Sequence, residues 1–292
     1  MQIESVAVLG AGTMGSGIAA FCAQAGCRVA LLDVTRGAAE QALARMVEGR
    51  PPTLEKPAKA DLITPGSFED DLAAAVGSTD WICEAIVEDL ATKRALFGRL
   101  EPLLRAGSVV SSNTSGILLR TITEGLPLRL RGDIAVTHFF NPVRVMRLVE
   151  LVPGAETRAE VMQTLERFLA ERLGKGVVHA KDTVNFIGNG IGCFWMLSGL
   201  HKAHAGLAGS LSMEQIDALL AAPVGIPPTG LYGLLDLVGL DVLELVARNL
   251  AANLPEGDAG LTFAPAADRA SDGRARSARP QDRRRLLPPD PS

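Results

Sequence analysis

The stretch SVAVLGAGTMG, residues 5–15, decides the fold of the first part of this chain. An apolar run ends directly at a glycine turn, and apolar residues then recur at helical spacing from Ile18 to Ala25. A second strand-like run, 28–33, follows and ends in Asp33. Strand, glycine turn, helix and strand in this order predict the first βαβ unit of a parallel sheet.

The glycine turn predicts a dinucleotide-binding site. Gly10 allows the tight turn, Gly12 lets the backbone approach a pyrophosphate, and Gly15 permits close packing of helix on strand. The pyrophosphate would rest on the helix N-terminus at Thr13 and Met14, whose free N–H groups favour an anion. The alternative is a glycine-rich turn without a ligand, which the strand before it and the helix after it disfavour.

Asp33 indicates which dinucleotide this is. A carboxylate at the end of the second strand hydrogen-bonds the ribose hydroxyls of NAD and repels the 2′-phosphate of NADP. Arg36 lies close enough in sequence to leave the strictness of this preference open.

The alternation of helices and strands continues far along the chain. We expect helices at 38–47, 71–76, 90–104 and 159–173, and strands at 81–85, 109–111, 134–138, 148–152 and 176–180. The proline-containing stretch 50–65 interrupts the alternation and is expected to be a surface excursion.

The pattern changes after Lys181 and Asp182. Helices are expected at 186–208, 212–221 and 233–253, and the stretch from 258 is rich in Arg, Pro, Ala and Asp with little apolar periodicity. The prediction is an α/β protein with a Rossmann-type doubly wound parallel sheet in residues 1–181. A smaller all-helical domain follows in 182–257, and then a disordered or aberrant tail in 258–292.

His138 and Glu150 carry the most specific chemistry. His138 ends a predicted strand, so it should lie at the carboxyl edge of the sheet, where ligands of α/β proteins bind. Imidazole titrates near neutrality and can take the proton of an alcohol whose hydride goes to a nicotinamide. Glu150 lies within an apolar strand and could hold the imidazole in one tautomer. A structural histidine and a strand-end charge are the alternatives.

A second polar cluster, 111–115, ends another predicted strand. Its hydroxyls and amide could bind a substrate oxygen or a nicotinamide ribose. Such residues equally cap helices and form turns, and composition alone would favour that role.

The bulk properties exclude several classes of protein. The net charge is −4 over 292 residues, which does not indicate nucleic-acid binding. No apolar run reaches the roughly 18 residues that a membrane span needs, and no secretory leader is evident. The four cysteines are scattered without metal-ligand spacing, which predicts free buried thiols, no metal site and a cytoplasmic location.

Five ordered motifs resemble the L-3-hydroxyacyl-CoA dehydrogenases of fatty-acid β-oxidation, and most closely the dehydrogenase part of long bacterial enzymes that carry further domains. The resemblance runs from residue 3 to about 257. The motifs are the glycine turn with Asp33, EAIVE at 84–88, SNTS at 112–115, HFFNP at 138–142 with Glu150, and KDT at 181–183 with Asn189.

The resemblance implies NAD-dependent oxidation of an acyl-CoA by a homodimer. His138 would be the general base, Glu150 its orienting partner, and Ser115 and Asn189 would bind the 3-oxygen of the substrate. The NAD site would be lined, besides the glycine turn and Asp33, by Glu88, Lys93, Asn113 and Asn141. Lys56 or Lys59 would meet the phosphates of CoA.

The chain departs from the family pattern in two places. The family usually has Asp-Thr-Pro-Gly-Phe and then Asn-Arg, whereas this chain has DTVNF at 182–186 and then Asn189-Gly190. The tail lacks the Gly-Phe-Tyr-rich closing motif, and a GC-rich gene read in a shifted frame would explain it. The nucleotide sequence tests this idea.

Two alternatives to the dehydrogenase remain. One is an NAD-binding protein of the same fold that lacks a complete acyl-CoA cleft and is catalytically impaired. The other is a β-hydroxyacid dehydrogenase acting on free acids, a group that generally relies on a lysine in the helical domain. After Lys181 this chain has only Lys202, and it carries the His138–Glu150 pair, which disfavours this alternative.

Overall fold

The computed structural model describes residues 2–225 and 228–253. The contact pattern divides the chain into two compact units, Met1–Phe186 and Ile187–Ser292. The tail predicted to be disordered, 258–292, lies outside the described residues, so this prediction is not tested.

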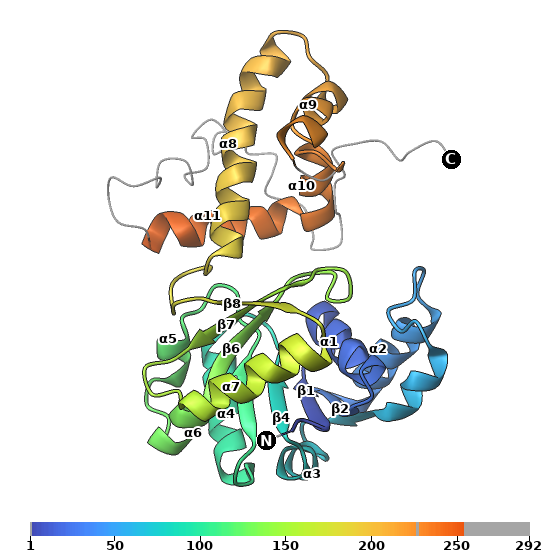
Figure 1. The fold of residues 1–292 in the computed structure, drawn as a ribbon, viewed down its shortest axis with the longest axis vertical. Helices are drawn as coiled ribbons and strands as arrows, with labels where there is room; N and C mark the ends of the chain where they lie inside the picture. Colours follow the sequence, from blue (N-terminus) through green and yellow to red (C-terminus); the bar gives the residue numbers. More distant parts are fainter. Residues whose placement is uncertain (1, 226–227, 254–292) are drawn as a thin grey trace. The chain divides into compact units, whose positions relative to one another are not determined.

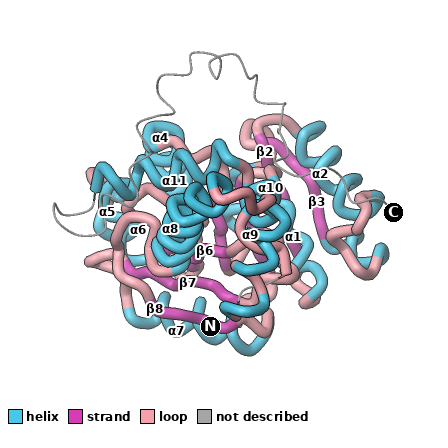
Figure 2. The backbone as a smooth tube through the Cα atoms, turned by 90° about the horizontal axis from the view of Figure 1, so that it is seen from above, coloured by secondary structure: helices cyan, strands magenta, loops and turns pink. Residues whose placement is uncertain are grey.

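The first unit is built on an eight-stranded sheet with the order β3-β2-β1-β4-β5-β6-β7-β8. In Figure 2, β2 and β3 lie side by side near one end of the sheet and β8 near the other. Neighbouring strands are parallel, except that β6 and β7 are antiparallel. The strands are β1 Ser5–Leu9, β2 Arg28–Asp33, β3 Ile63–Ser67, β4 Trp81–Glu84, β5 Val109–Ser112, β6 Ile134–Phe139, β7 Leu148–Pro153 and β8 Gly176–His179.

Helices cover both faces of this sheet (Figure 1). Alternate residues of β1 point to opposite faces: Val6 and Val8 join one apolar core with α1, α2 and α7, whereas Ala7 and Leu9 join a second core with α3, α4 and α5. The predicted Rossmann-type doubly wound fold is confirmed. The helices are α1 Thr13–Gln24, α2 Arg36–Glu48, α3 Leu72–Ser78, α4 Leu90–Leu100, α5 Leu119–Thr123, α6 Leu128–Asp133 and α7 Ala159–Arg167.

The stretch 50–65 differs from the prediction at its end. It was expected to be a surface excursion, but Ile63–Ser67 forms the edge strand β3, preceded by the 3-10 helix Pro57–Leu62. The strand contains Pro65 and Gly66, which read as loop residues in sequence. Proline is tolerated here because an edge strand has ladder partners on one side only.

The other predicted helices and strands are present, most of them with ends shifted by one or two residues, whereas the short helices α5 and α6 were not predicted. The predicted helix 90–104 ends at Leu100 and continues as the 3-10 turn Glu101–Leu103, and α7 continues as a π-helical turn, Phe168–Arg172. Proline at position 102 cannot supply the N–H that an α-helix needs.

The second unit is helical, as predicted. It contains α8 Gly188–Ala208, α9 Met213–Leu219, a 3-10 turn Ala222–Val224, α10 Tyr232–Val238 and α11 Leu240–Asn253. The single helix predicted over 233–253 is two helices, because Gly239 adopts a φ of 95° between them.

The two units divide after Phe186, a few residues beyond the boundary expected at 181. Asp182 accepts hydrogen bonds from the backbone N–H groups of Leu119 and Arg120, at 2.7 and 2.9 Å. Phe186 is buried in the core that contains α4 and α5. The KDT segment therefore packs as part of the first unit.

Two further expectations concern membranes and thiols. Among the described residues, no helix is both long and apolar enough to cross a bilayer. All four cysteines, Cys22, Cys27, Cys83 and Cys193, are free and buried.

Candidate active site

The carboxyl ends of four parallel strands meet at one edge of the sheet. Leu9 of β1 pairs with Glu84 of β4, Glu84 pairs with Ser112 of β5, and Ser112 pairs with Val136 of β6. Since β7 runs antiparallel to β6, its first residues lie at the same edge. The glycine turn, the loops after β4 and β5, and the end of β6 are therefore brought together.

His138 and Glu150 form a buried pair at this edge. They stand directly opposite each other on β6 and β7, and His138 Nδ1 lies 2.7 Å from Glu150 Oε2. His138 is 4% exposed and Glu150 is 0% exposed. With Glu150 ionised, its carboxylate can only accept a hydrogen bond, so the Nδ1 of His138 would carry the proton and Nε2 would be the basic nitrogen.

Two aromatic rings enclose the imidazole. The ring centroid of Phe140 lies 4.6 Å from that of His138, and the ring of Phe186 lies 5.5 Å away. Phe186 comes from the end of the first unit, after the KDT segment. These apolar neighbours exclude water from the imidazole and fix its plane.

The glycine turn has the geometry that a pyrophosphate requires. A Cβ at Gly10 would lie 2.5 Å from the carbonyl oxygen of Ala85, and one at Gly15 would lie 1.8 Å from that of Gly10, so both glycines are needed for packing. A Cβ at Gly12 would meet no atom within 4 Å. Gly12 also provides no side-chain cap to α1, so the helix N-terminus is open to an anion.

Asp33 lies beside this turn. Its Oδ2 accepts a 2.6 Å hydrogen bond from the Ala11 N–H, and its Oδ1 accepts one from Val34 at 2.7 Å. Arg36, which left the NAD preference open, donates instead to both carboxylate oxygens of Asp71 and to the carbonyl of Pro65. A phosphate would have to compete with Asp71 for this guanidinium.

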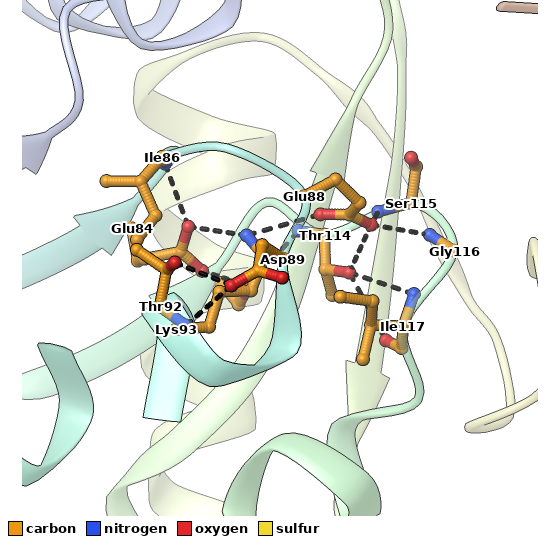
Figure 3. A network of polar contacts seen from close by, with 11 residues as sticks. Glu84, Ile86, Glu88, Asp89, Thr92, Lys93, Thr114, Ser115, Gly116 and Ile117 are labelled. Carbon is orange, nitrogen blue, oxygen red and sulfur yellow. Dashed lines mark hydrogen bonds and ion pairs between the residues drawn. The ribbon is translucent and has the colours of Figure 1, made fainter. Parts of the chain in front are cut away.

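An ionic network joins the end of β4 and helix α4 to the loop after β5, with Lys93 and Glu84 buried and Glu88 at its exposed end (Figure 3). Lys93 of α4 is 1% exposed, and its Nζ lies 2.6 Å from Glu84 Oε1 and 3.2 Å from Glu88 Oε2. Glu84 also accepts hydrogen bonds from the Ile86 N–H at 2.8 Å and the Ser112 hydroxyl at 2.5 Å. Buried charges are stabilised when each is paired and hydrogen-bonded, as here.

Glu88 connects this network to Ser115. Its Oε1 accepts hydrogen bonds from the Thr114 hydroxyl at 2.6 Å, the Gly116 N–H at 2.8 Å and the Ser115 N–H at 2.9 Å (Figure 3). Burial alone would raise the pKa of Glu88, but the Lys93 ammonium and these three donors outweigh it and hold the pKa below its ordinary value. Glu88 is therefore ionised and fixes the loop that carries Ser115.

Asn113 and Asn141 also lie at this edge. The Oδ1 of Asn113 accepts a 3.0 Å hydrogen bond from the N–H of Phe139, the residue after His138. Asn141 is exposed and lines a cavity of about 350 Å³ together with residues 142–145, Gly12 and Thr13. The cavity also borders α2 and the segment 51–53.

The remaining predicted site residues lie elsewhere. Lys56 is exposed just before the 3-10 helix, and Lys59 is half-buried within it. Neither lines the cavity, whose basic side chains are Arg45 and Arg144. Asn189 is in the first turn of α8, in the second unit.

The sequence analysis did not single out three side chains that the structure places in the network or in the lining of the cavity. Glu84 enters the sequence analysis only as part of a motif, although a carboxylate within the apolar predicted strand 81–85 signals a paired charge. Nothing in the sequence marks Arg45 and Arg144 as functional, because single arginines on a helix and in a loop are typical of any protein surface.

The comparisons with known proteins agree with this arrangement. Residues 5–183 match the family model described as 3-hydroxyacyl-CoA dehydrogenase, NAD binding domain, and residues 186–273 match its C-terminal domain. The chain belongs to the 3-hydroxyacyl-CoA dehydrogenase family. Its first unit is the NAD-binding domain, and the open helix N-terminus at Gly12 fits that cofactor.

Individual members of the 3-hydroxyacyl-CoA dehydrogenase family show the extent of the likeness. A Bacillus subtilis protein named "Probable 3-hydroxyacyl-CoA dehydrogenase" is 37% identical over 270 residues, covering 85% of this chain and 34% of that protein. The human mitochondrial hydroxyacyl-coenzyme A dehydrogenase is 34% identical over 258 residues, covering 84% of this chain and 79% of the human protein.

A solved structure shows the same architecture. The (S)-3-hydroxybutyryl-CoA dehydrogenase of Ralstonia eutropha aligns with a TM-score of 0.75 at 29% identity, covering 91% of each chain. The chain spans about a third of the length of the Bacillus relative and of two Rickettsia relatives. The family's C-terminal domain model extends to 273, past the residue near 257 where the resemblance was expected to end.

Proposed function

We propose that this chain oxidises L-3-hydroxyacyl-CoA to 3-ketoacyl-CoA with NAD, in fatty-acid β-oxidation. Membership of the family supports this activity. The observation that carries it is the 2.7 Å contact between His138 Nδ1 and Glu150 Oε2 at the edge of the sheet where the glycine turn lies. The pair supplies His138 as a base at the same sheet edge as the proposed cofactor site.

Bound NAD supplies the acceptor for the hydride that leaves C3 of the substrate. His138 then takes the hydroxyl proton on Nε2, because Nδ1 already carries its own proton toward Glu150. Glu150 stabilises the imidazolium that forms, and in the reverse direction His138 returns the proton to the oxygen. The burial of both side chains strengthens this electrostatic support.

Ser115 and Asn189 are proposed to bind the substrate's 3-oxygen. The position of Ser115 supports this role, because Glu88 holds its backbone next to the network at the sheet edge. The proposal for Asn189 rests on the motif in which it lies, before a glycine where the family usually has arginine.

The proposed NAD contacts fall into two groups. The turn residues Gly10, Gly12, Thr13, Met14 and Gly15 would hold the pyrophosphate, and Asp33 would bind the adenosine ribose. Glu88, Lys93, Asn113 and Asn141 are proposed to form the nicotinamide side. The structure gives Lys93 a buried place behind Glu88, so its influence would act through that carboxylate.

The proposal for CoA rests on basic side chains. The family resemblance places Lys56 or Lys59 at the CoA phosphates. Lys56 is exposed and therefore accessible to a phosphate. Arg45 and Arg144 line the cavity beside Asn141 and are further candidates.

We further propose a cytoplasmic homodimer formed through the second unit. Free buried cysteines are typical of a reducing compartment. The helical unit exposes many large apolar side chains, and such surfaces usually mark an interface. They include Ile191 (66% exposed), Leu237 (63%), Leu219 (57%) and Val224 (54%).

The first experiment compares two substrates in the direction of NADH oxidation. Loss of NADH absorbance with acetoacetyl-CoA, and none with free acetoacetate, would support the proposal. Turnover of acetoacetate instead would indicate an enzyme of free acids. Tight NADH binding without any turnover would indicate an impaired NAD-binding protein.

A further inference from the structure

Lys175 is a buried cation that the proposed mechanism does not use. It directly precedes β8 and is 6% exposed, and its backbone N–H donates to the Leu169 carbonyl at 2.9 Å. Within the described part of the chain, no carboxylate forms an ion pair with it. A buried ammonium without a counter-ion is costly, so its position calls for an explanation.

The ammonium is held by carbonyl groups and aromatic rings. Nζ donates hydrogen bonds to the backbone oxygens of Val143 and of Met146, the latter at 2.7 Å. It lies 4.1 Å from the ring centroid of Phe21 and 5.8 Å from that of Phe139. These are cation–π distances, and Phe139 directly follows His138.

The carbonyl groups belong to one compact segment, 141–147. The Pro142 carbonyl accepts hydrogen bonds from the N–H groups of Val145 and Met146, both at 3.0 Å, and the Arg147 carbonyl accepts one from Gly176 at 2.8 Å. Carbonyls at 143, 146 and 147 thus all bind Lys175 or its neighbour Gly176.

The same segment is pressed against α1. Val143 is 3% exposed, and a Cβ added to Gly17 would lie 2.9 Å from its Cγ2. Gly17 is one turn into the helix that begins at the glycine turn. The segment therefore has two attachments, Val143 on α1 and the Lys175 ammonium beneath its carbonyls.

We propose that Lys175 is a positioning residue for the NAD site, which acts by fixing segment 141–147 against α1. The segment carries Asn141 and forms one wall of the cavity that Gly12 and Thr13 also line. Releasing it would shift this wall away from the glycine turn and weaken cofactor binding. This inference rests on the proposed placement of the cofactor at the glycine turn, beside which this wall lies.

The charge of Lys175 depends on pH within an accessible range. Burial lowers its pKa to about 8, and the titratable group that faces it is the Cys22 thiol of α1, whose own pKa burial raises. The arginines of adjacent segments, Arg144, Arg147 and Arg172, reach solvent. Above about pH 8 the neutral amine keeps its N–H donors but loses its charge, so NADH affinity should fall.

The test measures the Kd for NADH by fluorescence in four variants. Lys175→Met should raise the Kd about tenfold, the factor that one charge-assisted hydrogen bond carries, and Lys175→Arg should restore part of the affinity. Lys202→Met, at an exposed lysine of α8, should bind as the wild type. The fourth variant, Asn141→Ala, tests the cofactor contact itself.

The outcomes separate the two proposals. Folded Lys175→Met with wild-type NADH affinity would overturn the role of Lys175, whatever Asn141→Ala does. Unchanged affinity in Asn141→Ala alone would contradict the Asn141 contact and leave Lys175 supported. A merely structural lysine would lower the melting temperature and leave the Kd of the folded fraction unchanged.

The wild type gives a second readout that does not depend on how Lys175→Met folds. Its Kd for NADH should rise between about pH 7 and pH 9.5, whereas Lys175→Arg should show no such rise, because a guanidinium stays charged. Equal rises in the wild type and in Lys175→Arg would overturn the proposal, because the titrating group would then not be Lys175.

Discussion

The pairing of His138 with Glu150 depends on charge as well as on shape. Both side chains are buried, and Nδ1 lies 2.7 Å from Oε2. An amide in place of the carboxylate would keep the shape but could present its NH₂ group to Nδ1, which selects the wrong tautomer and leaves the imidazolium without its counter-charge.

Glu150→Gln should therefore lower kcat by roughly 10²- to 10⁴-fold, with a much smaller effect on NADH binding. The chain offers a matched control in Glu166→Gln, because Glu166 pairs with His179 at 3.1 Å on the surface, with both side chains about half exposed. That variant should keep wild-type kcat. Near-normal turnover in Glu150→Gln would show that the carboxylate does not support the base.

Glu88 gives a prediction about acid stability. Its pKa is held below the ordinary value of 4.5, so its ionised form stabilises the folded state. That stabilisation is fully present above the unfolded pKa and is lost as the pH falls through the lower folded pKa.

In Glu88→Gln, the free energy of unfolding should therefore fall less steeply between about pH 5 and pH 3 than in the wild type. Denaturant titrations across this range measure it. Glu40→Gln, at an exposed position of α2, should keep the wild-type slope. Equal slopes in all three proteins would contradict the contribution of Glu88.

The sequence alone identified the residues whose side-chain chemistry and place on a predicted strand indicate a function. A histidine and a carboxylate on neighbouring predicted strands could be paired from the pattern alone, and the structure places them opposite each other. It could not identify Lys175, because a lysine in a turn is normally solvated. Its burial arises only when segment 141–147 folds over it.

At the scale of elements, the glycines of the turn have different tasks: Gly15 is required for packing, and Gly12 is proposed to admit the cofactor. A Cβ at Gly15 would lie 1.8 Å from a backbone oxygen, whereas one at Gly12 would meet nothing. Gly15→Ala should thus destabilise the fold by about 2–4 kcal/mol.

Gly12→Ala should behave in the opposite way. It should melt within a few degrees of the wild type and yet bind NADH at least about tenfold more weakly, because the methyl group would occupy the approach of the pyrophosphate. Calorimetry and NADH fluorescence on the two variants measure this. Wild-type NADH affinity in Gly12→Ala would contradict the placement of the cofactor.

Elements defined by the backbone were harder to predict than those defined by side-chain pattern. β3 contains Pro65 and Gly66, so its sequence shows no strand signal, and it forms because β2 offers an open edge. In the segment 182–186, Asn185 has a φ of 58° and Phe186 a φ of 48°. Asparagine stands where the family usually has glycine, and it is a residue that tolerates this left-handed region.

At the scale of the whole molecule, the two units carry different kinds of residues. The first unit contains the glycine turn, the His138–Glu150 pair and the ionic network, all at one sheet edge. The second unit carries Asn189, whose contact with the substrate is a proposal, and several exposed apolar side chains on its helices. The proposed homodimer predicts a mass near twice 30.7 kDa by light scattering. Elution as a monomer at micromolar concentration would contradict it.

The most direct test of the central claim compares wild type and His138→Ala with NADH and acetoacetyl-CoA. NADH consumption is followed by absorbance, and the Kd for NADH is measured on the same samples by fluorescence. We predict that the variant binds NADH as the wild type does and loses turnover by about 10³-fold or more. If His138→Ala turns over acetoacetyl-CoA at the wild-type rate, His138 is not the catalytic base.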